Sequence, residues 1–263
     1  MLKNITGTFF TRILVSVLNF AIIILTAKLM GAEMRGSISL CMLAIAIAGL
    51  INEIVGGPAV VYLVPRFNNR SIAMYSYLWA MLVSLSSSLL LGLFHFYDIE
   101  LLPLVASCSL MLCLGSIHQF LLLGHQKIKA FNSIALSQSV ILFIVFISFI
   151  FQKQYHIQSY FYALLIAYSM SFILGLKYTN FVWKKDEQIN QKPTLKILFN
   201  NGLLTQLASL THLMSSRITF YFSSHFISLA FVGVLSTALS ITEAAMLFSS
   251  SVALITASTV SNE

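Results

Sequence analysis

The chain begins with two long apolar runs joined by a short connector. The runs cover Phe9–Met30 and Ser37–Val64, and the segment LMGAEMRG (Leu29–Gly36) joins them. At ~1.5 Å of rise per residue, each run is long enough to cross a hydrocarbon core of ~30 Å as an α-helix. The sequence therefore predicts a transmembrane hairpin at its start.

Both runs carry a stripe of polar or small residues at helical spacing. The first stripe consists of Arg12, Ser16, Asn19 and Thr26, and the second of Gly49, Asn52, Glu53 and Gly56. Residues three, four or seven apart lie on one face of a helix. A charged group that faces lipid costs several kcal/mol, so these faces should meet protein or a water-filled cavity. We expect a polar lumen at this hairpin, enclosed by the remaining helices.

The composition predicts an all-α integral membrane protein. Hydrophobic residues make up 58% of the chain, charged residues only 9%, and the mean hydropathy is +0.90. A soluble domain has about 25% charged residues. The apolar runs are too long for the ~10-residue strands of a membrane β-barrel. The net charge of +7 is therefore interpreted through its distribution among the loops, and no nucleic-acid partner is expected.

The three cysteines and the N-terminus carry no further signal of chemistry or processing. Cys41, Cys108 and Cys113 lie inside apolar runs without the spacing of a metal or redox motif, so we expect small buried side chains. No cofactor or metal is expected. The first residues, MLKN, are too weakly basic for a secretory signal, and the first run should be a retained helix.

Polar and turn-forming segments divide the chain into eight predicted spans. They cover about Phe9–Met30, Ser37–Val64, Met74–Phe96, Leu101–Leu123, Ser133–Phe151, Tyr160–Val182, Leu198–Phe222 and Leu229–Val260. The long polar segment WKKDEQINQKPTLK separates the sixth span from the seventh.

The basic residues predict that the N-terminus lies in the cytoplasm. In that orientation ten basic residues are inside: Lys3, Arg66, Arg70, Lys127, Lys129, Lys177, Lys184, Lys185, Lys192 and Lys196. Three are outside, namely Lys28, Arg35 and Lys153. Such a bias is typical of short cytoplasmic loops.

The seventh and eighth spans repeat the plan of the first two. The seventh has a polar stripe made of Thr205, Ser209, His212, Ser216, Thr219 and Ser223, with Arg217 at its edge. The eighth carries Glu243, as the second carries Glu53. The two short connectors end in Gly36 and Gly233. Repeats with a site between them are common in secondary transporters, and both first helices start on the same side, as in a parallel repeat.

Three pieces of the chain resemble one family of transporters. They are GTFFTRILVSVLNFAIIILTAKLMGAEMRG, LLLGHQKIKAFN and NNGLLTQLASLTHLMSSRITFYFSSHFISLAFVGVLSTALSITE. They are similar to the polysaccharide-biosynthesis flippases of the multidrug/oligosaccharidyl-lipid/polysaccharide exporter superfamily. The resemblance implies a non-enzymatic, multi-pass protein of the bacterial cytoplasmic (inner) membrane. Its substrate would be a polyprenyl-pyrophosphate glycan, used to build lipopolysaccharide or another surface polysaccharide.

The resemblance also implies a larger architecture. Members usually have twelve or more helices in two six-helix bundles. By that comparison, 1–183 form the first bundle, 184–196 form a basic cytoplasmic linker, and 197–263 form the first two helices of a second bundle. We therefore expect the chain to be a fragment, a truncated reading frame or half of a split gene, and not to support flipping alone.

The resemblance assigns roles to lumen residues. Arg12, Asn19, His212 and Arg217 would bind substrate, since arginine offers a planar fork for pyrophosphate oxygens. Glu53 and Glu243 would bind a coupling proton or sodium ion. Each has a structural alternative. Arg12 can snorkel to headgroups, His212 can form an interhelical hydrogen bond, and the acids can be structural ion-pair or hydrogen-bond partners.

Two other functions compete with a flippase. A multidrug antiporter of the same superfamily would move organic cations and should favour acids over arginines in its lumen. A membrane-bound glycan polymerase or acyltransferase is less favoured, because the outside loops are short and carry no paired-carboxylate or His/Asp constellation. We favour the flippase, whose partners would be the lipid-linked oligosaccharide and the surrounding membrane lipids.

Overall fold

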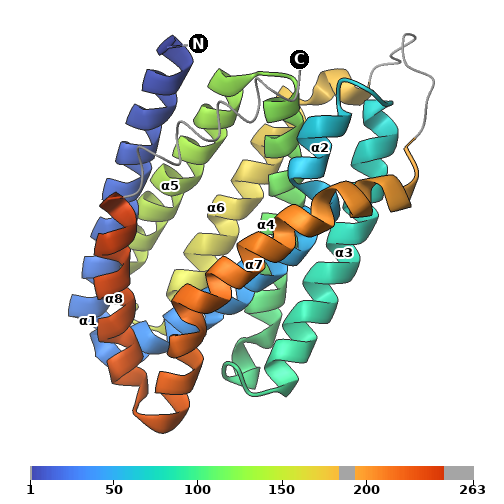
Figure 1. Cartoon of the computed structure of the whole chain (residues 1–263). Coiled ribbons are helices and arrows are strands. Elements are labelled where there is room, and N and C mark those ends of the chain that lie inside the picture. The colour runs from blue at the N-terminus through green and yellow to red at the C-terminus, as the bar shows by residue number, and fades with distance from the viewer. Residues whose placement is uncertain (1, 184–192, 246–263) are drawn as a thin grey trace.

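The computed structural model describes residues 2–183 and 193–245; the side chains of 2–6, 183, 241 and 243–245 fall outside this description (Figure 1). Within these residues every regular element is helical. The α-helices are α1 (Leu2–Gly56), α2 (Pro58–Leu63), α3 (Asn69–Leu93), α4 (Leu102–Gly124), α5 (Ile128–Phe151), α6 (Ile157–Tyr178), α7 (Leu195–Phe226) and α8 (Leu229–Ala245). Two short 3-10 helices, η1 (Ile99–Leu101) and η2 (Asn180–Trp183), flank α4 and α6.

The first hairpin bends at a single residue. Gly31 has φ 84° and ψ 168°, a conformation that costs glycine little but strains residues with a Cβ. The chain is helical again from the next residue onward. The predicted connector Leu29–Gly36 is therefore wrong in extent, because one glycine makes the bend and the remaining residues extend the second helical segment.

The second half of α1 ends earlier than predicted. The helix stops at Gly56, Gly57 is not helical, and Pro58 starts the short helix α2. Proline suits the first turn of a helix, where its missing N–H would have no intrahelical acceptor. A Cβ on Gly57 would overlap the carbonyl group of Glu53, so only glycine fits this break.

Helices α5 and α6 begin before their predicted starts, because polar residues at their ends remain helical. The basic turn after α4 is confined to residues 125–127, with Gln126 at φ 56°, and α5 starts at Ile128 rather than Ser133. Asn132, which the sequence placed in the turn, donates instead to the hydroxyl of Thr8 (3.0 Å). It thereby ties α5 to α1.

Five described segments are long and apolar enough to span a membrane. They are Gly7–Leu63, Asn69–Leu93, Ile99–Gly124, Ile128–Phe151 and Ile157–Tyr178. The first contains the bend at Gly31 and has 57 residues, enough for two crossings of ~30 Å. Helix α7 is long but carries the polar stripe, and α8 offers a shorter apolar stretch, Leu229–Ser240. The all-α class is thus confirmed for the described residues, and the long apolar helices are compatible with a membrane helical bundle.

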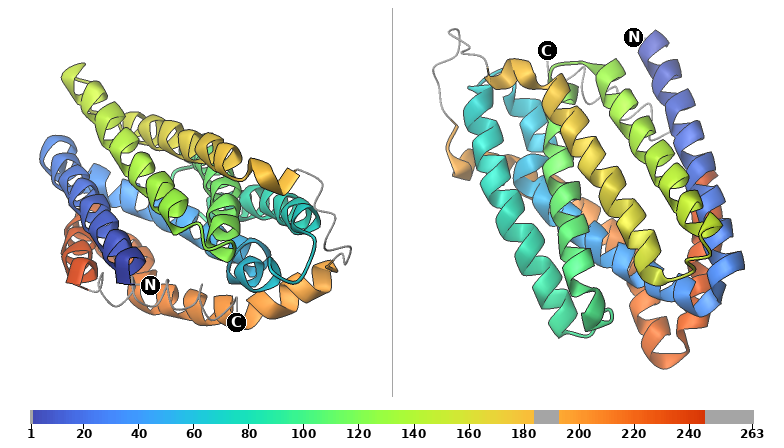
Figure 2. Two further views of the ribbon diagram at one scale, coloured as in Figure 1. Left: turned by 90° about the horizontal axis from the view of Figure 1, so that it is seen from above. Right: turned by 180° about the vertical axis from the view of Figure 1, so that it is seen from behind.

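Helix α1 lies at the centre of the packing. Its second half is covered by α3 and α4 on one side and by α7 on the other, and α8 packs along it (Figures 1 and 2). One apolar core joins α1, α4, α5 and α6 and includes Phe146 and Phe161. A second core joins α1 to α4 and α7. Cys41, Cys108 and Cys113 are buried and free, as predicted.

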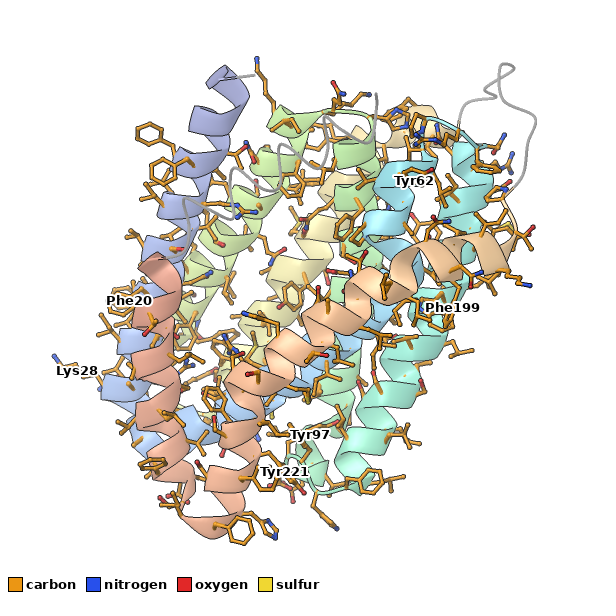
Figure 3. The ribbon with its side chains drawn as sticks, viewed as in Figure 1. Phe20, Lys28, Tyr62, Tyr97, Phe199 and Tyr221 are labelled. Carbon is orange, nitrogen blue, oxygen red and sulfur yellow. The ribbon has the colours of Figure 1, made fainter. Side chains whose placement is uncertain are left out.

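Aromatic contacts hold α7 at both of its ends. Near its start, Phe199 meets Trp79 of α3 edge-on, with ring centroids 5.9 Å apart. Near its end, Tyr221 stacks on Phe96, with centroids 4.8 Å apart (Figure 3). The neighbouring Tyr97 donates to the carbonyl of Ser88 (2.7 Å), and burial raises the pKa of this hydroxyl to about 12. Helix α7 therefore crosses the bundle in a fixed diagonal.

A buried polar chain braces α3, α4 and α6. His118 of α4 is fully buried; its Nε2 lies 2.6 Å from the hydroxyl of Tyr77, and its Nδ1 lies 2.7 Å from Oγ1 of Thr179. Thr179 in turn donates to the carbonyl of Gly175 (2.8 Å). Gly175 is required here, because a Cβ would press into the His118 side chain.

Candidate functional site

A cavity of about 650 Å³ lies inside the bundle. Six helices contribute to its wall: α1, α4, α5, α6, α7 and α8. Figure 3 views the molecule with α7 and α8 in front of α5 and α6. The polar lining residues are Ser16, Asn19, Arg35, Ser39, Glu53, Ser116, Gln119, Gln138, Ser139, Tyr160, Tyr168, Arg217, Ser236 and Ser240. A cavity of this size matches the usual range for ligand sites, ~300–1,000 Å³.

The bundle has two ends that the loops define. The kink end carries the bend at Gly31 and the α5–α6 and α7–α8 turns, at the bottom of Figure 1. The N-terminal end carries the start of α1 and the α2–α3 and α4–α5 turns, at the top. Helix positions therefore report how deep each lining residue lies.

Two arginines line the cavity toward the kink end. Arg35 follows the bend in α1 by one helical turn, and Arg217 comes from the last third of α7. Both side chains line the same cavity, as does Tyr160. Arg35 is only 7% exposed, and within the described part of the chain its Nε has no hydrogen-bond partner. Two neighbouring guanidinium groups create a site that an anion would stabilise.

The kink end of the cavity is closed by a tight crossing of α1 and α8. A Cβ on Gly36 would overlap the carbonyl group of Leu229, and a Cβ on Gly233 would overlap that of Ala32. Next to this crossing, the hydroxyls of Ser39 and Ser236 lie 2.8 Å apart. The two glycines that the sequence placed at connector ends instead lie inside helices that pack against each other.

The opposite part of the cavity contains an acid. The Glu53 carboxylate accepts a hydrogen bond from Nε2 of Gln206 in α7 (3.3 Å). Beside this bond, α7 approaches α1 so closely that a Cβ on Gly202 would overlap the carbonyl group of Ile54. Arg35 and Glu53 are 18 residues apart in α1, which corresponds to ~27 Å along the helix axis. The positive and negative groups are thus widely separated.

Uncharged polar side chains line the cavity away from the two arginines. They are hydroxyl and amide groups from three helices: Ser16 and Asn19 of α1, Ser116 and Gln119 of α4, and Gln138 and Ser139 of α5. The aromatic rings of Phe20, Phe120 and Phe131 line the same part. Rings and uncharged hydrogen-bonding groups together suit a polar but neutral ligand.

The structure brings together some of the residues that the sequence singled out. Asn19, Glu53 and Arg217 line the cavity. Arg12 is half-buried on α1 and His212 is exposed on α7, and neither is among the lining residues. Glu243 belongs to α8, but its side chain lies outside the described residues. The functional roles of all six stay predictions.

Arg35 is the lining residue that the sequence reasoning assigned elsewhere. The sequence predicts it in an outside connector, because the segment Leu29–Gly36 between the apolar runs has the polar and glycine residues of a loop. The signal that could have placed it is the four-residue spacing to Ser39, whose hydroxyl donates to the carbonyl of Arg35 (2.9 Å). That spacing indicates a helix continuing through the connector.

Glu53 forms a structural hydrogen bond within the described residues, one of the alternatives that the sequence left open. Its partner is the amide of Gln206, a buried residue of the α7 face that meets α1. Asn52, next to it, is fully buried and donates to the carbonyl of Cys113 (3.3 Å) and the hydroxyl of Ser116 (3.2 Å) of α4. Only one of these two neighbours therefore faces the cavity.

The arrangement can bind and orient a ligand. In the part of the chain that is described, no three His, Cys, Asp or Glu side chains gather in a way that could hold a metal ion. Among the described residues, the charged side chains that line the cavity are those of Arg35, Arg217 and the distant Glu53. This set fits recognition of an anionic ligand with a neutral polar portion.

Comparisons with known proteins identify a shared fold. No protein-family model matches the chain, and no curated protein sequence matches it. A solved structure called protein A superposes on it with a TM-score of 0.79, covering 99% of this chain at 15% sequence identity. The chain spans 64% of the length of that structure. At this identity the likeness concerns the fold alone.

Proposed function

We propose that the chain is part of a membrane flippase that translocates a lipid-linked oligosaccharide for surface polysaccharide biosynthesis. The observation that carries the proposal is the pair Arg35 and Arg217, which come from different helices and line one cavity. A polyprenyl-pyrophosphate glycan has the matching chemistry, because its pyrophosphate needs cationic partners and its sugars need hydrogen bonds.

The physical task of such a protein is to shield polar groups from hydrocarbon. A pyrophosphate and its glycan cannot cross ~30 Å of lipid unaided. Within the cavity, guanidinium forks would hold the pyrophosphate oxygens, while hydroxyl and amide groups replace water around the sugars. The lipid tail would remain among the apolar helix faces.

The finer architecture belongs to this proposal. We infer eight membrane spans with the N-terminus in the cytoplasm of a bacterial cell, counting the two halves of α1 separately and adding α7 and α8. Residues 1–183 would form one six-helix bundle, 184–196 a cytoplasmic linker, and 197–263 the start of a second bundle. The activity of a complete transporter would need the longer architecture. Glu53 would bind a coupling proton or sodium ion.

A cation antiporter is the second candidate, and Glu53 is the observation that favours it. A lipophilic cation would place its charge beside this carboxylate. Two arginines in the same cavity oppose such a ligand, because like charges in a partly desolvated site repel. Among the described residues, no observation favours an enzymatic function.

Binding to the purified chain in detergent tests the proposal. The probe is a farnesyl diphosphate disaccharide, and affinity is measured by fluorescence or calorimetry. We expect Arg35→Gln and Arg217→Gln each to weaken binding about tenfold or more, because each removes a charge-assisted hydrogen bond. The matched control is Arg70→Gln, since Arg70 is exposed on α3, far from the cavity lining.

The antiporter makes the opposite prediction in the same assay. Binding of tetraphenylphosphonium that is lost in Glu53→Gln and strengthened in Arg217→Gln would favour it. Absence of diphosphate-saccharide binding to the unmodified chain would reject the flippase proposal. Equal binding by Arg35→Gln, Arg217→Gln and Arg70→Gln would also reject it.

A further inference from the structure

The charged residues of the cavity are segregated along its length. Arg35 and Arg217 lie toward the kink end, and Glu53 lies ~27 Å along α1 from Arg35. Apart from Arg35 and Arg217, none of the described lining residues is a Lys, Arg or His. The other lining residues besides Glu53 carry hydroxyl or amide groups or are apolar or aromatic. The cavity therefore has a cationic end, and the rest of its lining carries no cation among the described residues.

We propose that the part of the cavity lined by hydroxyl, amide and phenylalanine side chains is a saccharide subsite that selects uncharged sugars and rejects sugars bearing a carboxylate. The neutral subsite is defined as Ser16, Asn19, Ser116, Gln119, Gln138 and Ser139, with Phe20, Phe120 and Phe131. This inference rests on the proposed function, which places the pyrophosphate at Arg35 and Arg217. The first sugars after the pyrophosphate must then lie along the neutral subsite.

The neutral subsite matches the hydrogen-bonding capacity of sugar hydroxyls. Each hydroxyl both donates and accepts, and so do the side chains of serine, asparagine and glutamine. These groups come from α1, α4 and α5, so they approach a ligand from more than one side. The phenylalanine rings supply flat apolar surface for the C–H faces of a pyranose.

A carboxylated sugar would lack a partner in the same place. Moving a carboxylate out of water without a cationic partner is costly. Glu53 lies beside the neutral subsite, because its neighbour Asn52 donates a hydrogen bond to Ser116, and an ionised Glu53 would repel a second carboxylate. The preference for neutral over carboxylated sugars therefore comes from the absence of a cation among the described residues of the subsite. Glu53 reinforces this preference.

The selectivity is tested with two probes that differ in one group. Both are farnesyl diphosphate disaccharides; one carries two neutral hexoses, and in the other the first hexose is replaced by a hexuronic acid. We expect the unmodified chain in detergent to bind the neutral probe about tenfold more tightly than the acidic one. Gln138→Lys should strengthen binding of the acidic probe about tenfold and thereby remove the preference.

Three further variants complete the test. Gln119→Lys places the same charge on α4 and replaces Gln138→Lys if that variant does not fold. Gln152→Lys is the matched control, because Gln152 is exposed beyond the end of α5 and should leave the preference intact. Arg35→Gln should lower the affinity for both probes by the same factor, because Arg35 would contact the diphosphate that the two probes share.

The outcomes separate the subsite from the proposed function. Equal affinity for the two probes, unchanged by either new lysine, would overturn the neutral subsite; the flippase proposal would survive if both affinities still fell in Arg35→Gln. Tighter binding of the acidic probe to the unmodified chain would also overturn the subsite. If neither probe bound, the proposed function would be rejected, and the inference with it.

Discussion

At the scale of single residues, His118 shows how a buried histidine can be fixed in one neutral form by its neighbours. Thr179 uses its hydrogen to donate to Gly175, so its oxygen must accept from Nδ1–H of His118. The remaining nitrogen, Nε2, then accepts from the hydroxyl of Tyr77. The assignment follows from the donor count of the chain of bonds. This brace joins three helices through one ring.

Tyr77→Phe should destabilise the protein by about 1–2 kcal/mol, because it leaves the buried Nε2 atom without a donor. The measurement is thermal unfolding of the purified protein in detergent. Tyr75→Phe is the matched control: Tyr75 is half-buried on the same helix, and its hydroxyl is not part of the brace. Equal unfolding temperatures for Tyr77→Phe and Tyr75→Phe would show that the brace adds nothing.

Part of the cavity could be predicted from residue spacing alone. Ser16, Asn19 and Glu53 line it because stripes at helical spacing must turn away from lipid. Arg35 could not be placed, since its position depends on where a bend falls and a single glycine suffices to make one. Gln119 and Gln138 lie in helices whose polar residues are too few for a long stripe, so the packing of α4 and α5 around α1 is needed to place them in the lining.

At the scale of helices, the crossing of α1 and α8 depends on two glycines. Gly36 and Gly233 let the backbones touch, and the Ser39–Ser236 hydrogen bond lies beside them. Side chains larger than hydrogen cannot enter this contact unless the helices separate, because the opposing atoms belong to the backbone. Close contact through small residues is a common way for membrane helices to pack.

A cysteine pair can report on this crossing. With Cys41, Cys108 and Cys113 replaced by serine, Ser39→Cys and Ser236→Cys should form a disulfide on mild oxidation, since the two hydroxyl oxygens lie 2.8 Å apart. Adding Gly36→Ala should push α8 away and lower the yield severalfold. Electrophoresis without reductant measures the linked fraction.

The matched control for the crossing is Gly7→Ala. Gly7 also lies in α1, but a Cβ there would have nothing within 4 Å. Alanine favours a helix over glycine by about 1 kcal/mol, so this change should leave the disulfide yield intact. If the disulfide yield is as high with Gly36→Ala as with Gly7→Ala, the α1–α8 contact does not depend on glycine.

The helices themselves were largely predictable, and their ends were not. The apolar runs predict α3, α4, α5 and α6, because each run is long enough for a membrane-spanning helix. Ends depend on local backbone conformations, such as Gly31 in α1 or Gln126 before α5, that hydrophobicity does not encode. The diagonal path of α7 arises from aromatic contacts with distant residues, which spacing cannot reveal.

At the scale of the whole molecule, charge is distributed unequally between the two ends of the bundle. The N-terminal end carries Arg66, Arg70, Lys127, Lys129 and Lys177, all exposed. The kink end carries the exposed acids Glu33, Asp98 and Glu100 together with Lys28 and Lys153. Lys28 points away from the bundle (Figure 3). Basic loops usually stay in the cytoplasm, which favours the N-terminal end as the inner one.

Cysteine labelling of intact cells tests this orientation. A membrane-impermeant maleimide should react with Asp98→Cys and not with Lys129→Cys, since the two exposed positions lie at opposite ends of the bundle. The unmodified chain is the control: its three cysteines are buried and should remain unlabelled. Permeabilised cells should then label Lys129→Cys as well, which shows that the site is reactive once reached. Labelling of Lys129→Cys alone in intact cells would invert the topology. The cavity would then have its arginine end on the cytoplasmic side, where a pyrophosphate substrate would meet it first.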